Sequence, residues 1–146
     1  KNDKTLIDMG SGAGFPGVIL AIGAKDRNIS LKIQLIDKSP RKVNFLRELI
    51  KKLSLDVDVI CENILSEQKI ISQDVIVARA FKPLGIILEL IHSKAKNWKK
   101  IFVFLGKTGK KELVHASKYW DIKYKQSVSV TNSDSLVLEI NGIKKK

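Results

Sequence analysis

The sequence predicts a doubly wound α/β domain whose sheet is mainly parallel and ends in an antiparallel hairpin. Short apolar runs alternate with helical patterns along most of the chain, as expected when helices connect parallel strands. A glycine-rich stretch, DMGSGAGFPG at residues 8 to 17, follows the first apolar run directly. Near the end of the chain, two strand-like runs flank the turn-rich TNSDS at residues 131 to 135, which indicates a hairpin.

Each expected element follows from its apolar periodicity and from the residues at its ends. The helix over residues 41 to 53 has one apolar face, Ser39 can cap its free amides, and Pro40 suits its first turn. In chain order, we expect a strand at 5–9, a helix at 16–25, a strand at 32–37, the helix at 41–53, strands at 57–63 and 74–81, a helix opening near 83, a strand at 100–106, a short helix near 110–119, and a hairpin of 120–130 with 135–140.

The composition fits one globular domain with a nucleic acid as its leading partner. The chain has 146 residues, of which 44% are hydrophobic, enough for a sizeable core. A net charge of +12 is typical of proteins that bind polyanions, although a genome biased toward lysine codons would also raise it. Cys61 is the single cysteine, and no apolar run is long enough for a membrane span. We therefore expect a cytoplasmic protein without a metal ion or an obligate protein partner.

The glycine loop indicates a nucleoside ligand held close to the backbone. Gly12, Gly14 and Gly17 satisfy the G-x-G-x-x-G pattern between a strand and a helix, and Asp37 ends the next strand. Glycines let the backbone approach the ligand, and the carboxylate can accept both ribose hydroxyls. A nicotinamide dinucleotide and S-adenosylmethionine both meet this description, and a tight turn without any ligand is the structural alternative.

Asp8 favours a cationic ligand over a phosphate chain. It lies at the carboxyl end of the first expected strand, two residues before Gly10, where we expect its charge to point toward the ligand. A pyrophosphate would be repelled there, whereas the sulfonium and ammonium groups of S-adenosylmethionine would be attracted. A hairpin after five parallel strands also suits a methyltransferase sheet better than a dehydrogenase. Both observations favour S-adenosylmethionine as the cofactor.

Three motifs resemble one family of RNA-modifying enzymes. DMGSGAGFPG, LIDKSPRKVNFLREL and VARAFKPL keep the order and spacing of the bacterial small-subunit rRNA guanine-N7 methyltransferases, the RsmG (GidB) type. The similarity weakens after about residue 100. It implies a Rossmann-like class I methyltransferase fold, S-adenosylmethionine as cofactor, and N7 of a guanine in 16S rRNA as methyl acceptor. It also implies that residues 1 to 146 form a single methyltransferase domain that lacks the family's N-terminal helical segment.

The resemblance assigns cofactor-binding roles to individual positions. Gly10 and Phe15 match loop positions that contact the cofactor in that family, and Asp37 matches the acid that binds the ribose. Phe15 fits a core position equally well. The full expected cofactor set is Asp8, Gly10, Gly12, Gly14, Phe15, Asp37, Asn63, Ile64 and Arg79.

Two positions depart from the family pattern. Asn63 and Ile64 stand where members usually carry an Ala-Glu pair beside the adenine, so the carboxylate is lost or displaced to Glu62. Leu105 stands where members carry a lysine before a glycine. A cofactor-binding or RNA-binding remnant without turnover is therefore an alternative to an active enzyme. A nicotinamide-dependent oxidoreductase is a third interpretation, which Asp8 disfavours.

The chemistry implied by the resemblance needs alignment more than acid–base catalysis. Guanine N7 carries a free lone pair, so no general base has to remove a proton before it attacks the methyl group. Arg79 matches the family's active-site arginine, and we expect it at the buried end of a strand, where its charge needs a partner. Cys61 is expected to be a buried filler, and His92 and His115 to have surface or packing roles.

Basic residues near the expected ligand supply candidate RNA contacts. Arg41 and Lys42 match a basic pair that faces RNA in the family, and further lysines follow the fifth expected strand. The lysines at 94, 96, 99 and 100 are expected to be a solvated helix end, favoured by the helix dipole. The expected RNA-binding residues are Arg41, Lys42, Lys107, Lys110 and Lys111, with Arg47 as a further candidate.

Overall fold

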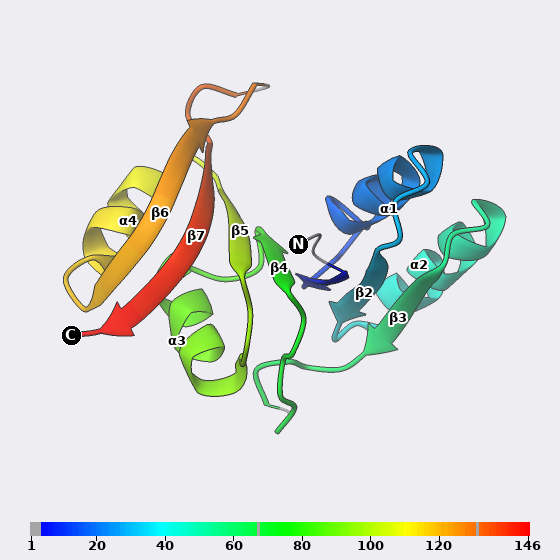
Figure 1. Cartoon of the computed structure of the whole chain (residues 1–146), viewed down its shortest axis with the longest axis horizontal. Helices are drawn as coiled ribbons and strands as arrows, with labels where there is room; N and C mark the ends of the chain where they lie inside the picture. Colours follow the sequence, from blue (N-terminus) through cyan, green and yellow to red (C-terminus); the bar gives the residue numbers. More distant parts are fainter. Residues whose placement is uncertain (1–3, 67, 131) are drawn as a thin grey trace.

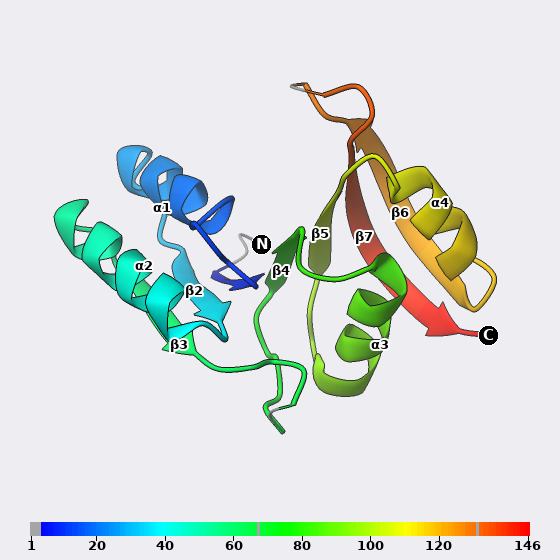
Figure 2. The same cartoon turned by 180° about the vertical axis from the view of Figure 1, so that it is seen from behind.

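The computed structural model describes residues 4–66, 68–130 and 132–146 and contains a seven-stranded sheet with helices on both faces (Figures 1 and 2). The strands are β1 (Thr5–Met9), β2 (Lys32–Asp37), β3 (Val57–Cys61), β4 (Val75–Arg79), β5 (Lys100–Leu105), β6 (Trp120–Val128) and β7 (Leu136–Lys145). The helices are α1 (Gly17–Asp26), α2 (Pro40–Lys52), α3 (Leu84–Lys94) and α4 (Gly109–Ala116).

The strand order is β3-β2-β1-β4-β5-β7-β6, and the first five strands pair in parallel. β7 pairs antiparallel with β5 and with β6. The prediction of a doubly wound sheet with a C-terminal hairpin is therefore confirmed. The chain builds outward from β1 to β3 and then returns to β4 on the other side of β1. In such sheets, ligands bind above the carboxyl ends of the strands where the direction of winding changes.

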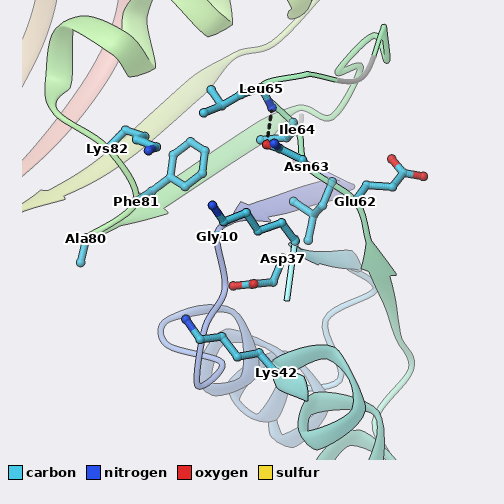
Figure 3. A pocket seen from close by; sticks show the side chains of 12 residues that line it. Gly10, Asp37, Lys42, Glu62, Asn63, Ile64, Leu65, Ala80, Phe81 and Lys82 are labelled. Atoms are coloured by element: carbon cyan, nitrogen blue, oxygen red, sulfur yellow. Dashed lines mark hydrogen bonds between the residues drawn. The ribbon is translucent and has the colours of Figure 1, made fainter. Parts of the chain in front are cut away.

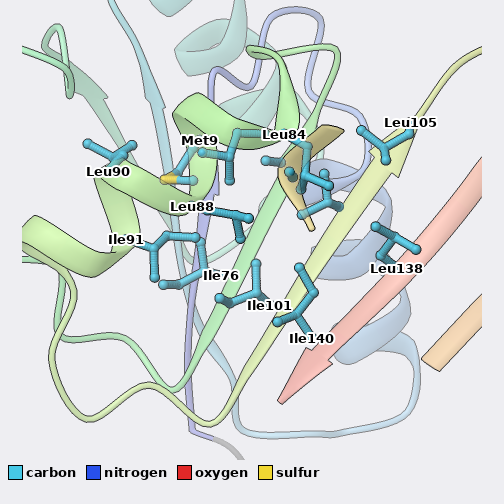
Figure 4. Packing of buried hydrophobic residues seen from close by; sticks show 14 of the residues in the cluster. Met9, Ile76, Leu84, Leu88, Leu90, Ile91, Ile101, Leu105, Leu138 and Ile140 are labelled. Carbon is cyan, nitrogen blue, oxygen red and sulfur yellow. The ribbon is translucent and has the colours of Figure 1, made fainter. Parts of the chain in front are cut away.

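Two hydrophobic clusters fix the helices to the sheet. One lies between the sheet and α3 with α4, and Met9, Ile76 and Leu88 are among its fully buried members (Figure 4). The other lies under α1 and α2 and includes Val18 and Leu46. Because apolar side chains are buried on both faces, the strands form a rigid support for the residues at their carboxyl ends.

The ends of α2 and the hairpin show how well local patterns predicted the elements. Ser39 accepts a hydrogen bond from the backbone N–H of Lys42 at 3.4 Å, and Pro40 occupies the first turn, both as predicted. β7 continues to Lys145, beyond the predicted end of the hairpin at residue 140. Pairing with β6 extends it, with a bulge between Lys123 and Tyr124.

The lysine run at residues 94 to 100 is not the solvated helix end that we predicted. Lys99 forms an ion pair with Asp74 at 2.7 Å, and Lys100 lies 3.7 Å from Glu139. These pairs join the starts of β4 and β5 to each other and to β7. Lys99 and Lys100 therefore connect strands at the end of the sheet opposite the expected ligand.

Candidate functional site

A cavity of about 270 Å³ lies at the carboxyl ends of β1, β2, β3 and β4 (Figure 3). Its volume is near the lower end of the range for small-molecule pockets, roughly 300 Å³. It stands at the change of winding direction, where the fold predicts a ligand. The lining residues are Gly10, Ile36, Asp37, Lys38, Lys42, Glu62, Asn63, Ile64, Leu65, Ala80, Phe81 and Lys82.

The glycine loop adopts a backbone that other residues rarely tolerate. Gly10, Gly12 and Gly14 have φ values of 71°, 57° and 92°, all in the left-handed region. A Cβ atom at Gly10 would also collide with the ring of Phe81. The loop turns back toward β2, because the N–H of Gly10 donates to the carbonyl of Ile36 at 2.8 Å. The glycine pattern thus sets the shape of one wall of the cavity.

Asp37 joins the glycine loop to the cavity. Its Oδ2 accepts a hydrogen bond from the N–H of Gly12 at 3.0 Å, and its Oδ1 accepts one from the N–H of Ser39 at 2.9 Å. The side chain is mostly buried but still lines the cavity. A carboxylate has about four acceptor positions, so two backbone donors leave room for two hydroxyl groups. This geometry suits the binding of a ribose.

Asp8 lies beneath the loop and is absent from the cavity lining. Its carboxylate is 1% exposed and accepts a hydrogen bond from the N–H of Gly17, the first residue of α1, at 2.9 Å. Burial raises the pKa of Asp8 to about 6, and the charge of Asp37 adds to this effect. The prediction that the carboxylate points at the ligand is therefore wrong, because it faces the start of the helix.

The position of Asp8 still favours a cationic ligand such as S-adenosylmethionine over a dinucleotide with a pyrophosphate. A dinucleotide pyrophosphate normally binds at the N-terminus of the first helix, where N–H groups and the helix dipole attract an anion. Here the protein's own carboxylate already accepts the N–H of Gly17 at that place. A second anion would add repulsion, whereas a cationic ligand would not.

The segment after β3 forms the wall beside Asp37. The side-chain oxygen of Asn63 accepts the N–H of Leu65 at 3.2 Å, and Ile64 is almost fully buried (Figure 3). Glu62 also lines the cavity, and its carboxylate pairs with Lys69 at 3.2 Å. Glu62 therefore belongs to this wall, while its carboxylate is paired with Lys69, and a role of Glu62 in place of the family's carboxylate stays a prediction.

Lys94 holds the segment after β3 in place through two hydrogen bonds. Its ammonium group, at the end of α3, donates to the carbonyl oxygens of Ile64 at 2.8 Å and of Leu65 at 3.1 Å. Bonds from a charged donor are stronger than neutral ones, so this lysine holds the wall of the cavity in place. Sequence reasoning missed this role, since nothing local to Lys94 indicates what its side chain reaches.

The segment after β4 forms the opposite wall. Ala80, Phe81 and Lys82 line it, and none of them was among the predicted site residues, although Phe81 belongs to the quoted motif VARAFKPL. Arg79 is exposed and makes no hydrogen bond or ion pair with another described residue. The prediction of a buried, partnered Arg79 is wrong, because burial along β4 ends at the residue before it.

Three other expectations concern residues outside the cavity. Phe15 is 50% exposed and does not line the cavity, so the core alternative for it is wrong. Cys61 is exposed, which contradicts the expected buried filler. His92 lies against Trp120 with ring centroids 5.3 Å apart, and His115 lies against Tyr119 at 5.5 Å. Both histidines belong to α3 and α4, away from the cavity.

The predicted RNA-binding residues lie at the starts of two helices, α2 and α4. Arg41 and Lys42 are exposed in the first turn of α2, and Lys42 also lines the cavity. Lys107, Lys110 and Lys111 are exposed before and within the first turn of α4. Arg47 reaches the carbonyl of Val59 at 3.1 Å. In the described parts of the chain, no helix is long and apolar enough to cross a bilayer, and no three potential metal ligands gather.

The strand order, the glycine loop and the carboxylate at the end of β2 define a class I S-adenosylmethionine-dependent methyltransferase fold. TrmK of M. capricolum, solved with S-adenosylhomocysteine, matches with a TM-score of 0.68 at 20% identity over 97% of this chain and 63% of that one. A S-adenosylmethionine-dependent methyltransferase from Aquifex aeolicus matches with a TM-score of 0.68 at 18% identity, over 98% of this chain and 83% of that one.

Sequence comparison identifies the family. The family model GidB, rRNA small subunit methyltransferase G, matches residues 1–138. Ribosomal RNA small subunit methyltransferase G of Pelagibacter ubique is 41% identical over 99% of this chain and 68% of its own length. That of Paramagnetospirillum magneticum is 32% identical over 96% and 65%. The chain belongs to the rRNA small subunit methyltransferase G family, and it spans about two thirds of the length of these two relatives.

Proposed function

We propose that this chain transfers the methyl group of S-adenosylmethionine to N7 of a guanine in 16S rRNA. One observation carries the proposal: Asp37 lines a cavity at the change of winding direction while two backbone N–H groups hold its carboxylate. The family assignment supplies the reaction class. We further propose that residues 1 to 146 act as one domain and that the reaction takes place in the cytoplasm, where ribosomal subunits assemble.

The cavity offers a distinct wall to each part of the cofactor. Asp37 would accept the ribose hydroxyls, and the segment from Asn63 to Leu65 would border the adenine. Gly10, directly after β1, would border the methionine part. When bound, S-adenosylmethionine supplies a methyl group on a positively charged sulfur. Among the other members of the expected cofactor set, Gly12 and Gly14 would act by shaping the loop.

The reaction itself requires little from ionisable side chains. The N7 lone pair forms the new N–C bond while the C–S bond breaks, so the positive charge passes from sulfur to the guanine. No proton has to move, and positioning of the base supplies most of the rate enhancement. We propose that Arg79, exposed beside the cavity, contacts the RNA at the reacting base and is the catalytic residue.

The basic residues at the starts of α2 and α4 would hold the RNA backbone. Arg41 and Lys42 lie at the start of α2, and Lys107, Lys110 and Lys111 lie around the start of α4. Contacts to phosphates fix the register of an RNA without reading its sequence. The net charge of +12 agrees with a large electrostatic share of the binding free energy.

Transfer of a radiolabelled methyl group to unmethylated small ribosomal subunits tests the proposal. We expect labelled N7-methylguanine in 16S rRNA, and a loss of at least tenfold for Asp37→Ala and Arg79→Ala. Asp58→Ala and Arg27→Ala are matched controls, because both side chains are exposed and do not line the cavity. Cofactor binding without transfer to subunits or to naked 16S rRNA would favour the non-catalytic remnant instead. Buried Leu105, at the family's lysine position, is the observation on which that alternative depends.

A further inference from the structure

The ring of Phe81 is held at the cavity by the glycine loop. Phe81 is half-buried and lines the cavity, and a Cβ atom at Gly10 would collide with its ring. The absence of a side chain at Gly10 therefore lets the ring lie directly against the loop. In Figure 3, Phe81 and Lys82 lie on one side of the cavity, and Asn63 and Glu62 lie on the other.

The backbone on either side of the ring is constrained as well. Ala80 has a φ of 48°, a left-handed conformation that an alanine adopts only when its surroundings enforce it. After the ring, the N–H of Leu84 donates to the Oε2 atom of Glu112 at 2.9 Å, and Thr108 donates to the Oε1 atom at 2.7 Å. The segment from residue 80 to 83 is thus anchored at both ends. Strained backbone of this kind concentrates at functional sites.

The position of the ring distinguishes it from the cofactor-binding walls. Asp37 and the segment after β3 provide the groups that suit a ribose and an adenine, whereas Phe81 follows β4 on the far side of β1. A methyl acceptor must approach the carbon from the side opposite the sulfur. The wall after β4 is the side left for it, and Lys82 is exposed there with no bond to another described residue.

We propose that Phe81 is the platform on which the target guanine stacks, and that Gly10, Ala80 and Glu112 hold this platform in place. The inference rests on the proposed function and adds the group that orients the methyl acceptor. Unpaired RNA bases are commonly bound by stacking on aromatic rings, and loss of such a ring typically costs about 10- to 100-fold in affinity.

Replacement of the flat ring by an apolar side chain without a flat face tests the proposal. In Phe81→Leu and Phe81→Met, the contact with the loop is retained, so we expect the Kd for S-adenosylhomocysteine to change less than threefold. The kcat/KM for small ribosomal subunits should fall about 10- to 100-fold. Phe81→Tyr keeps the flat face and should retain most of the wild-type value. Phe45→Leu is the matched control, because Phe45 is exposed on α2 and outside the cavity.

The outcomes separate this inference from the proposed function. If the wild-type chain transfers methyl groups and Phe81→Leu or Phe81→Met does so within threefold, the platform is overturned and the proposed function stands. A parallel loss of S-adenosylhomocysteine binding and transfer also overturns it, because the ring would then serve the cofactor. If the wild-type chain binds the cofactor but methylates no ribosomal RNA, the proposed function and the platform fail together.

Discussion

The carboxylate of Asp8 accepts a hydrogen bond from the backbone N–H of Gly17, with 2.9 Å between oxygen and nitrogen. The acid is buried under the glycine loop, and the amide opens helix α1. A buried charge is thereby placed against the positive end of a helix dipole, which stabilises the charge only in part. The arrangement has consequences for both folding and ligand choice.

The first prediction concerns the dependence of stability on pH. Burial raises the pKa of Asp8 from 3.8 to about 6, so the folded chain binds this proton more tightly than the unfolded chain. The stabilising effect of the proton is complete below pH 3.8 and is lost as the pH rises through 6. In Asp8→Asn the side chain stays neutral and can still accept the N–H of Gly17. We expect this variant to exceed the wild type by up to about 3 kcal/mol in free energy of unfolding above pH 6.

Chemical denaturation of both proteins from pH 4 to pH 8 measures this difference directly. The advantage of the variant should disappear near pH 4, where the wild-type acid is protonated too. Asp58→Asn, which changes an exposed acid on β3, is the control and should show no such trend. A difference that is independent of pH would contradict the assignment to Asp8.

The second prediction concerns the charge of the cofactor. Without the negative charge of Asp8, the positive end of α1 is left uncompensated beneath the loop. We expect Asp8→Asn to weaken binding of S-adenosylmethionine about 3- to 10-fold more than binding of S-adenosylhomocysteine, which lacks the sulfonium charge. Titration calorimetry with both ligands gives the ratio. An equal loss for the two would show that Asp8 acts through the shape of the loop alone.

The third prediction compares two glycines. Gly10→Ala introduces a Cβ atom at a φ of 71° and against the ring of Phe81, so we expect a loss of about 1–3 kcal/mol in stability, together with weaker cofactor binding. Gly23 lies within α1 with open space where a Cβ would stand. Gly23→Ala should be neutral or should stabilise the chain by roughly 0.5–1 kcal/mol. Thermal unfolding with and without S-adenosylhomocysteine tests both, and equal effects of the two changes would refute the argument.

The fourth prediction concerns Lys94. Lys94→Met removes two charged hydrogen bonds to the carbonyls of Ile64 and Leu65, so the wall of the cavity loses its support. We expect S-adenosylhomocysteine to bind about tenfold more weakly, which is the effect of roughly 1.4 kcal/mol. Lys96→Met, at an exposed neighbour, is the matched control. Unchanged affinity in Lys94→Met would mean that the segment after β3 keeps its shape without the lysine.

The order and type of the elements were predictable because each one has its own apolar periodicity or capping residue. Ser39 with Pro40 determined the start of α2, and the glycines determined the loop. The end of β7 was not predictable, since its last residues are held by pairing with β6 and not by burial.

The candidate site was predictable where local sequence sets the geometry. Gly10, Asp37, Asn63 and Ile64 line the cavity. Asp37 was expected there from its place at the end of a strand, and the other three from the family resemblance. The role of Phe81 was missed because it depends on the return of the chain to β4 and on the unusual backbone of the preceding residue. The true direction of Asp8 was likewise set by the helix that packs above it. Such facts depend on tertiary packing and leave no trace in a short segment.

Titration calorimetry of the chain with S-adenosylhomocysteine and with NAD tests the central claim most directly. If the cavity beside Asp37 holds the cofactor of a methyltransferase, S-adenosylhomocysteine binds at one site, Asp37→Asn weakens it about 10- to 100-fold, and NAD shows no binding. Binding of NAD without binding of S-adenosylhomocysteine, or S-adenosylhomocysteine binding that is unaffected by Asp37→Asn, would contradict the claim.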